Sequence, residues 1–191
     1  MRKLLLFVFI TISLFAIEKE NIASVMETKI NKSTSIIKEK LLTSKEKSVK
    51  IFPLFEDIFD YKLMTKLSLG KANWSKMNSK EKEEFTEKFI LKLKKSYMDK
   101  INLYTDERLN IVELKEINKK RVWLLTELVG SKDTYDIAYK FYKSKKSGWL
   151  IYDVDIIGVS LIQIYRAQFN NALEEGTYQT LLSKLDKPIN D

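Results

Sequence analysis

The hydrophobic pattern of this chain changes its period near residue 104, and this change constrains the fold more than any other feature. Before that point, apolar side chains recur every three or four residues, as on one face of an amphipathic helix. After it, apolar and polar side chains alternate, as on a half-buried strand. From residue 161 the helical spacing returns. Helices, then strands, then helices again predict an α+β fold.

Four alternating segments predict the sheet. They cover residues 109–117, 121–129, 134–143 and 149–157, and each is separated from the next by a short turn. Connections this short join antiparallel neighbours, so we expect a meander. In the last segment, we expect one face to hold Leu150, Tyr152, Val154 and Ile156.

Helical spacing predicts a first helix from residue 22 and a second over 47–59, bent near Pro53. A third is expected over 61–69, ended by Gly70 in the left-handed conformation. The longest is expected over 80–101, because Asn78 and Glu81 have the spacing of a capping box. Ser160 is expected to cap a helix over 161–173, and a short helix follows it.

The first residues have the order of a secretory signal: a basic start, an apolar run over 4–15, the small residue Ala16 and then polar residues. The apolar run is too short to span a bilayer comfortably. We therefore expect residues 1–16 to be a cleaved signal peptide and 17–191 a single exported domain. An uncleaved anchor or a buried helix is the alternative.

Cysteine and histidine are both absent from the chain. Their absence excludes disulfides, thiol nucleophiles, Ser-His-Asp triads and ordinary zinc sites. The formal net charge is +8. Lysines interleaved with glutamates are typical of a solvated surface, so we expect no nucleic-acid partner.

Four charged positions invite a functional interpretation. Asp153 and Asp155 share a strand face, as paired acid–base carboxylates would. Together with Asp136 they offer ligands for a metal, but no ligand-spaced loop supports a metal site. We interpret these carboxylates as structural. Arg166 falls on the shoulder of an apolar helix stripe. It is expected either to form an ion pair or to contact a phosphate group at a pocket mouth.

Three apolar surfaces must be covered in the folded chain: the third strand with Tyr135 and Ile137, the long helix with Phe85 and Phe89, and the helix after Ser160. Such surfaces form a filled core in most proteins. A curved sheet closed by helices can instead enclose an apolar cavity, and the residue pattern alone does not separate the two.

Two segments of the chain resemble the MlaC family, also described as toluene-tolerance or ABC-transporter auxiliary proteins. The first is a leucine-rich turn ending in Gly70, followed by Trp74 and a helix with Phe85 and Phe89. The second has Trp-x-x-x-Asp at 149–153, Gly-Val-Ser at 158–160 and Tyr-Arg-x-x-Phe at 165–169. With the signal segment and the element order, the resemblance covers nearly all of the mature chain.

The resemblance implies a highly twisted antiparallel sheet of four to five strands, packed with helices around a deep apolar pocket in a cone-like fold. It implies a monomeric periplasmic phospholipid shuttle between inner and outer membranes, the soluble component of an MCE-type ABC transport system that maintains outer-membrane lipid asymmetry. Its partners would be an inner-membrane MCE-domain transporter complex and an outer-membrane lipoprotein complex. It needs no cofactor, because phospholipid is its cargo.

On this interpretation, the core-facing apolar side chains line a lipid pocket, with Arg166 as a headgroup or ion-pair residue. The expected lining is Leu63, Leu67, Phe89, Leu93, Tyr97, Leu124, Ile137, Tyr139, Phe141, Val154, Ile156, Val159, Ile162, Tyr165 and Phe169. Two alternatives stay open. One is a periplasmic chaperone or adaptor, and the other is an enzyme of the ketosteroid-isomerase type, which the lack of histidine disfavours.

Overall fold

The computed structural model of the protein describes residues 17–101, 107–174 and 176–186. The predicted signal peptide, residues 1–16, lies outside this part. Five antiparallel strands form one sheet in chain order: β1 (Arg108–Asn118), β2 (Arg121–Val129), β3 (Thr134–Lys143), β4 (Trp149–Ile156) and β5 (Val159–Ser160). The predicted α+β class and meander are confirmed, and the four long strands match their predicted ranges to within one residue at each end.

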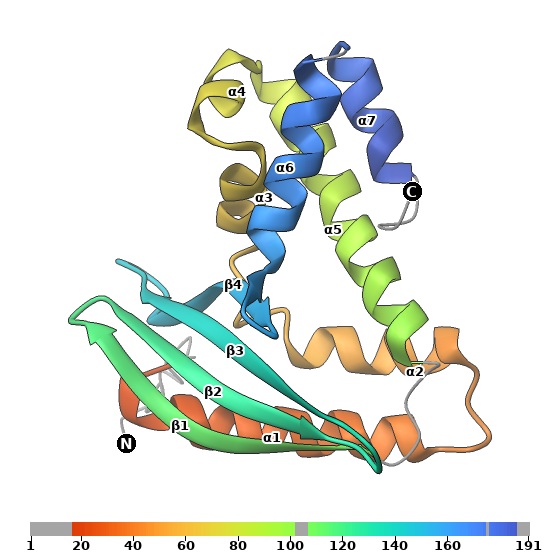
Figure 1. The fold of residues 1–191 in the computed structure, drawn as a ribbon, viewed down its shortest axis with the longest axis vertical. Helices are drawn as coiled ribbons and strands as arrows, with labels where there is room; N and C mark the ends of the chain where they lie inside the picture. The colour runs from red at the N-terminus through yellow and green to blue at the C-terminus, as the bar shows by residue number, and fades with distance from the viewer. Residues whose placement is uncertain (1–16, 102–106, 175, 187–191) are drawn as a thin grey trace, which may run out of the picture.

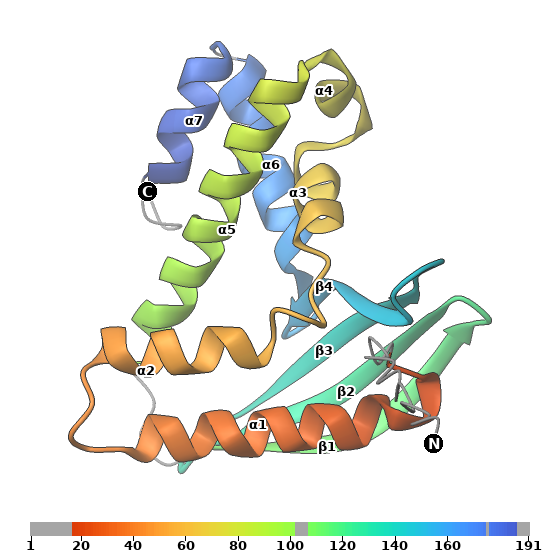
Figure 2. The ribbon, with the colours of Figure 1, turned by 180° about the vertical axis from the view of Figure 1, so that it is seen from behind.

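The helices form two groups around the sheet. α1 (Ile22–Lys38) runs along one face of the sheet, and α2 (Ser44–Ile51) follows it (Figures 1 and 2). The second group gathers at the other end of the molecule and consists of α3 (Tyr61–Leu69), α4 (Lys71–Lys76), α5 (Ser79–Ile101), α6 (Leu161–Glu174) and α7 (Tyr178–Asp186). Among the described residues, no helix combines the length and apolar character that crossing a membrane requires.

Local hydrogen bonds at helix starts follow the sequence signals. The Asn78 amide donates to Glu81 at 2.8 Å, and the Glu81 amide donates to Asn78 at 3.0 Å, so the predicted capping box is confirmed. The Gln163 amide donates to the Ser160 hydroxyl at 3.1 Å, which confirms that cap as well.

The chain around Gly70 differs from the prediction. Gly70 has a positive φ of 79° but an extended ψ of 154°, so it is not in the left-handed helical conformation. The chain turns there directly into α4, a helix that the sequence pattern did not predict. The helix expected over 47–59 begins earlier, at Ser44, and ends at Ile51; a single 3₁₀ turn, Phe52–Leu54, follows around Pro53.

An extra residue at Tyr152 changes the faces of β4. Lys140 of β3 pairs with Asp153 whereas Phe141 pairs with Ile151, so the register shifts by one residue between them. Trp149 and Ile151 consequently face α1, together with Val154. The prediction that Leu150 and Tyr152 share the face of Val154 is therefore wrong, because alternation by two does not continue through a bulge.

Apolar side chains form two separate cores. The sheet core lies between the sheet and α1, and its buried members include Ile22, Met26, Leu124 and Phe141. The helical core lies among α3, α5, α6 and α7 and is built on Phe85, Phe89, Tyr165 and Phe169. The side chain of Phe59 packs against both.

Candidate functional site

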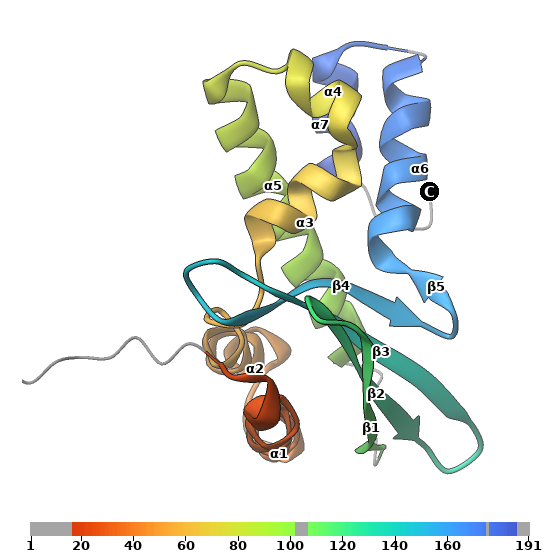
Figure 3. The ribbon, with the colours of Figure 1, turned by 90° about the vertical axis from the view of Figure 1, so that its left-hand side faces the viewer.

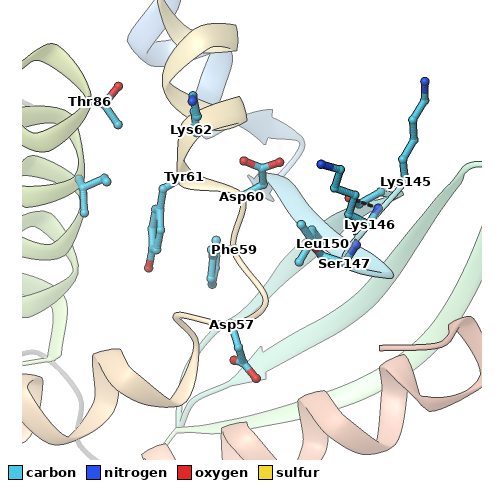
Figure 4. A pocket seen from close by; sticks show the side chains of 12 residues that line it. Asp57, Phe59, Asp60, Tyr61, Lys62, Thr86, Lys145, Lys146, Ser147 and Leu150 are labelled. Atoms are coloured by element: carbon cyan, nitrogen blue, oxygen red, sulfur yellow. Dashed lines mark hydrogen bonds between the residues drawn. The ribbon is translucent and has the colours of Figure 1, made fainter. Parts of the chain in front are cut away.

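A cavity of about 690 Å³ opens where the two cores meet. Three parts of the chain border it: the segment that enters α3, the middle of α5, and the turn between β3 and β4 with Leu150 (Figure 4). Its volume lies within the range of ordinary ligand sites. A second cavity, about 430 Å³, lies between α1 and the Pro53–Leu54 turn.

The segment that enters α3 is fixed to the sheet by backbone hydrogen bonds. The Ile151 amide donates to the Ile58 carbonyl at 2.7 Å, and the Asp60 amide donates to the Ile151 carbonyl at 2.9 Å. Asp60 also accepts the Leu63 amide at 2.9 Å, which caps α3, and accepts the Tyr142 hydroxyl. The Asp60 carboxylate thus has structural partners that hold this segment in place.

Two aromatic rings form the apolar wall. Phe59 and Tyr61 stack with centroids 5.5 Å apart and planes 15° apart, and Figure 4 shows them between α5 and the β3–β4 turn. Ile90 of α5 and Leu150 of β4 add aliphatic surface. Burial raises the pKa of Tyr61 to about 12, and the negative charge of Glu56 acts in the same direction, so its hydroxyl stays neutral at physiological pH.

Positive charge lies beside this apolar wall. Lys62, Lys145 and Lys146 line the cavity, and none of them forms an ion pair with another described residue. Asp57 also lines the cavity but pairs with Lys29 at 2.8 Å. Apolar side chains next to unpaired ammonium groups suit a ligand with an apolar part and an anionic part.

The structure distributes the predicted lining residues over the two cores. In the helical core lie Leu67, Phe89, Leu93, Ile162, Tyr165 and Phe169. Phe89 makes edge-to-face contacts with Tyr165 at 5.0 Å and Phe169 at 5.8 Å. Burial raises the pKa of Tyr165 to about 12, which keeps its hydroxyl neutral within this aromatic cluster.

The remaining predicted lining residues belong mainly to the sheet. Leu124 and Phe141 are buried against α1, with Tyr139 and Val154 packed beside them. Ile137 is half-buried, whereas Ile156 and Val159 are exposed near the β4–β5 turn. Leu63 is half-buried in α3, and the side chain of Tyr97 lies outside the described residues. None of the predicted lining residues with a described side chain borders the 690 Å³ cavity, and their contact with lipid stays a prediction.

Arg166 and Asp153, which the sequence singled out, have separate partners. Arg166 donates to the Leu67 carbonyl from Nε at 2.9 Å and from its terminal nitrogen, which satisfies the end of α3. Asp153 is buried, and it accepts the Ser160 hydroxyl at 2.7 Å and the Ile162 amide at 3.2 Å. Lys140 lies between Asp153 and Asp155 at 3.2 and 3.0 Å.

The sequence pattern places Leu150 on an apolar strand face but does not point to the other residues that border the cavity. It predicts a turn over residues 144–148 and places Phe59 within a helix. A usable signal was present: two aromatic residues, Phe59 and Tyr61, flank the helix-capping Asp60. The lysines of the β3–β4 turn come next to this pair only through strand pairing, which local sequence does not reveal.

Comparison with known proteins gives the chain a family. The model of the family described as MlaC protein matches residues 27–187. Among solved structures, the chain is similar to the phospholipid-binding protein from Ralstonia solanacearum, determined in complex with a phospholipid, with a TM-score of 0.73 and 20% identity over 85% of this chain and 93% of that one. No curated protein sequence matches the chain. Because the family model covers most of its length, the chain belongs to the MlaC family.

Proposed function

We propose that this protein binds a phospholipid at the cavity between α3, α5 and the β3–β4 turn. One observation carries the proposal: Lys145 and Lys146, which form no ion pair with a described residue, lie beside an apolar wall. That wall includes Phe59, Ile90 and Leu150. The wall suits acyl chains, and the ammonium groups suit a phosphate. Membership of the MlaC family and the phospholipid held by the similar Ralstonia protein support this assignment.

The proposed task is transport between the inner and outer membranes within the periplasm, after export by the signal peptide. Each methylene group buried from water is worth about 0.8 kcal/mol, so two tails with about 30 methylenes cost more than about 20 kcal/mol to carry unprotected. A carrier with an interior as apolar as a bilayer can load and release reversibly. The direction of transport then comes from the proposed partners, an inner-membrane MCE-type ABC transporter and an outer-membrane lipoprotein complex. Together with the carrier, they would maintain the lipid asymmetry of the outer membrane.

The proposal includes no catalytic step. Around the cavity, Asp57 pairs with Lys29 and Asp60 caps α3, so both carboxylates have structural partners. Within residues 17–101, 107–174 and 176–186, no cluster of three or more acidic residues is placed to hold a metal ion. A carrier requires neither kind of group.

Lipid extraction and mass spectrometry of the purified protein test this function. We expect phospholipid to co-purify without being added. Leu150→Glu places a carboxylate in the apolar wall, where it repels the lipid phosphate and competes with it for Lys145 and Lys146, so it should cut the bound lipid at least about tenfold. Val112→Glu is the matched control, because Val112 is an exposed apolar strand residue that does not border the cavity.

Two results would contradict the proposal: wild-type protein that carries no phospholipid, or equal lipid in Leu150→Glu and wild type. Circular dichroism of both variants must match wild type. Tyr139→Glu tests the wall predicted in the sheet core separately. If that variant folds and loses lipid while Leu150→Glu keeps it, the cargo lies in the sheet core and not in this cavity.

A further inference from the structure

Six cationic side chains gather at one end of the sheet. Lys119, Lys120 and Arg121 belong to the β1–β2 hairpin, and Lys143, Lys145 and Lys146 belong to the β3–β4 hairpin. All six are exposed. We call this set the basic rim. Residues 117–126 and 137–152, which contain it, include no aspartate or glutamate.

The two hairpins of the basic rim lie side by side. The Lys143 amide donates to the Lys120 carbonyl at 3.0 Å, and Arg121 is paired with Tyr142 across the strands. Figure 3 looks onto this end of the molecule, with both hairpin turns towards the viewer. Lys145 and Lys146 also border the cavity, so the rim continues to the cavity mouth.

Acidic side chains do not neutralise this end of the sheet. Glu116 is bound by Lys19 at 2.6 Å, and Asp60 is held by the Tyr142 hydroxyl. Glu18 and Glu20 are exposed near the bridge between Ile17 and Gly148. No described acidic residue forms an ion pair with any of the six rim cations. The rim therefore keeps a net positive charge.

We propose that the basic rim docks on the surface of an anionic lipid bilayer and holds the cavity mouth against it. Anionic headgroups attract clustered Lys and Arg, and the attraction acts over about one Debye length. A bilayer fits better than an acidic protein because Lys145 and Lys146 belong both to the rim and to the cavity lining. The proposal rests on the proposed function in one respect, that the ligand passing this mouth is a lipid.

Vesicle co-sedimentation of the purified protein tests the docking. Vesicles of phosphatidylcholine with about 30% phosphatidylglycerol should bind the protein, and phosphatidylcholine alone should not. Raising NaCl from about 0.05 M to about 0.5 M should release it, because screening weakens exposed charges. Absence of binding to the anionic vesicles, the result expected if the rim recognises an acidic protein, overturns the proposal.

The double variant Lys119→Glu/Lys120→Glu locates the binding surface. Neither residue borders the cavity. Binding to anionic vesicles should weaken at least about tenfold. The charge-matched control is Lys40→Glu/Lys45→Glu: both residues are exposed, and they lie in and beside the connection from α1 to α2, at the opposite end of the sheet (Figure 1). An equal loss in the control, or no loss in the rim variant, would show that the rim is not the docking surface.

Lipid content separates this inference from the proposed function. The Lys119→Glu/Lys120→Glu variant should still co-purify with as much phospholipid as wild type. If vesicle binding is absent but phospholipid is present, the docking inference fails and the carrier function stands. If phospholipid is absent from the wild-type protein, the carrier function itself fails.

Discussion

Phe59 and Ile151 form a parallel backbone bridge that fixes the entrance of α3 to strand β4. In this bridge, the Ile151 amide donates to the Ile58 carbonyl at 2.7 Å and the Ile151 carbonyl accepts from the Asp60 amide at 2.9 Å. It places the Phe59 ring where the helical core and the sheet core meet, and at the edge of the cavity.

Phe59→Ala should therefore weaken both cores. We expect a loss of about 2–4 kcal/mol in the free energy of unfolding, since a large half-buried ring leaves a void. The melting temperature followed by circular dichroism should fall by several degrees. Tyr135→Ala, at an exposed ring of β3, should change the free energy of unfolding by less than about 0.5 kcal/mol. Equal effects of the two substitutions would contradict the role given to Phe59.

Lys140 is the cation that compensates two carboxylates, the buried Asp153 and the half-buried Asp155. Its side chain is 12% exposed and that of Asp153 is 8% exposed. Burial lowers the pKa of Lys140, but the hydrogen bonds and negative charges of Asp155 and Asp153 outweigh it and raise the pKa overall. Lys140→Met leaves both carboxylates uncompensated and should cost about 3 kcal/mol in urea denaturation. Lys143→Met, at an exposed position of the same strand, should be nearly neutral.

Substitution of Arg166 distinguishes a structural role of its side chain from a contact with the lipid headgroup. Arg166→Met keeps the aliphatic stem but removes both donors to the Leu67 carbonyl, and it should destabilise the fold by about 1–2 kcal/mol. Co-purified phospholipid should be unchanged. A loss of lipid without a loss of stability would instead support the phosphate contact. Gln163→Met, at an exposed position of α6, is the control.

Ile157 has an unfavourable backbone conformation, with φ at +53° and a side chain that is 59% exposed. β-Branched residues are strained there, whereas asparagine tolerates positive φ. Ile157→Asn should stabilise the protein by about 1 kcal/mol, or about 2–4 °C in melting temperature. The same substitution at its exposed neighbour Val159 should bring no gain. A lower melting temperature for Ile157→Asn would contradict the strain.

Alkaline pH should weaken the fold. Burial raises the pKa of Tyr142 to about 12, and its hydrogen bond to Asp60 acts in the same direction. Because the folded pKa lies above the ordinary value of 10, the stabilisation is complete below pH 10 and is lost as pH rises through 12. Urea titrations between pH 9 and 11 should show stability falling less steeply in Tyr142→Phe than in wild type. Tyr135→Phe should keep the wild-type slope.

Much of the architecture is readable from local pattern. The capping box at Asn78 and Glu81 and the alternation of β2 and β3 depend on neighbouring residues, and both are found as predicted. The bulge at Tyr152 is different, because it is defined by pairing with β3 and so reverses the faces of Leu150 and Tyr152 without a local signal.

The cavity was harder to predict than the fold for the same reason. Phe59 and Leu150 come together through the bridge to Ile151, a contact between residues about ninety positions apart. Periodicity identifies which residues are apolar and not which apolar surfaces leave space between them. Arg166 shows a related limit: its position on the helix shoulder was readable, but its acceptor, the Leu67 carbonyl, belongs to a distant helix end.

The shared position of Phe59 has a consequence for cooperativity. A ligand in the cavity touches a ring that belongs to both cores, so its binding energy is not confined to either layer. We expect lipid-loaded protein to melt in a single transition, in which the near- and far-ultraviolet circular dichroism signals change together. Protein stripped of lipid should melt at a lower temperature by both signals.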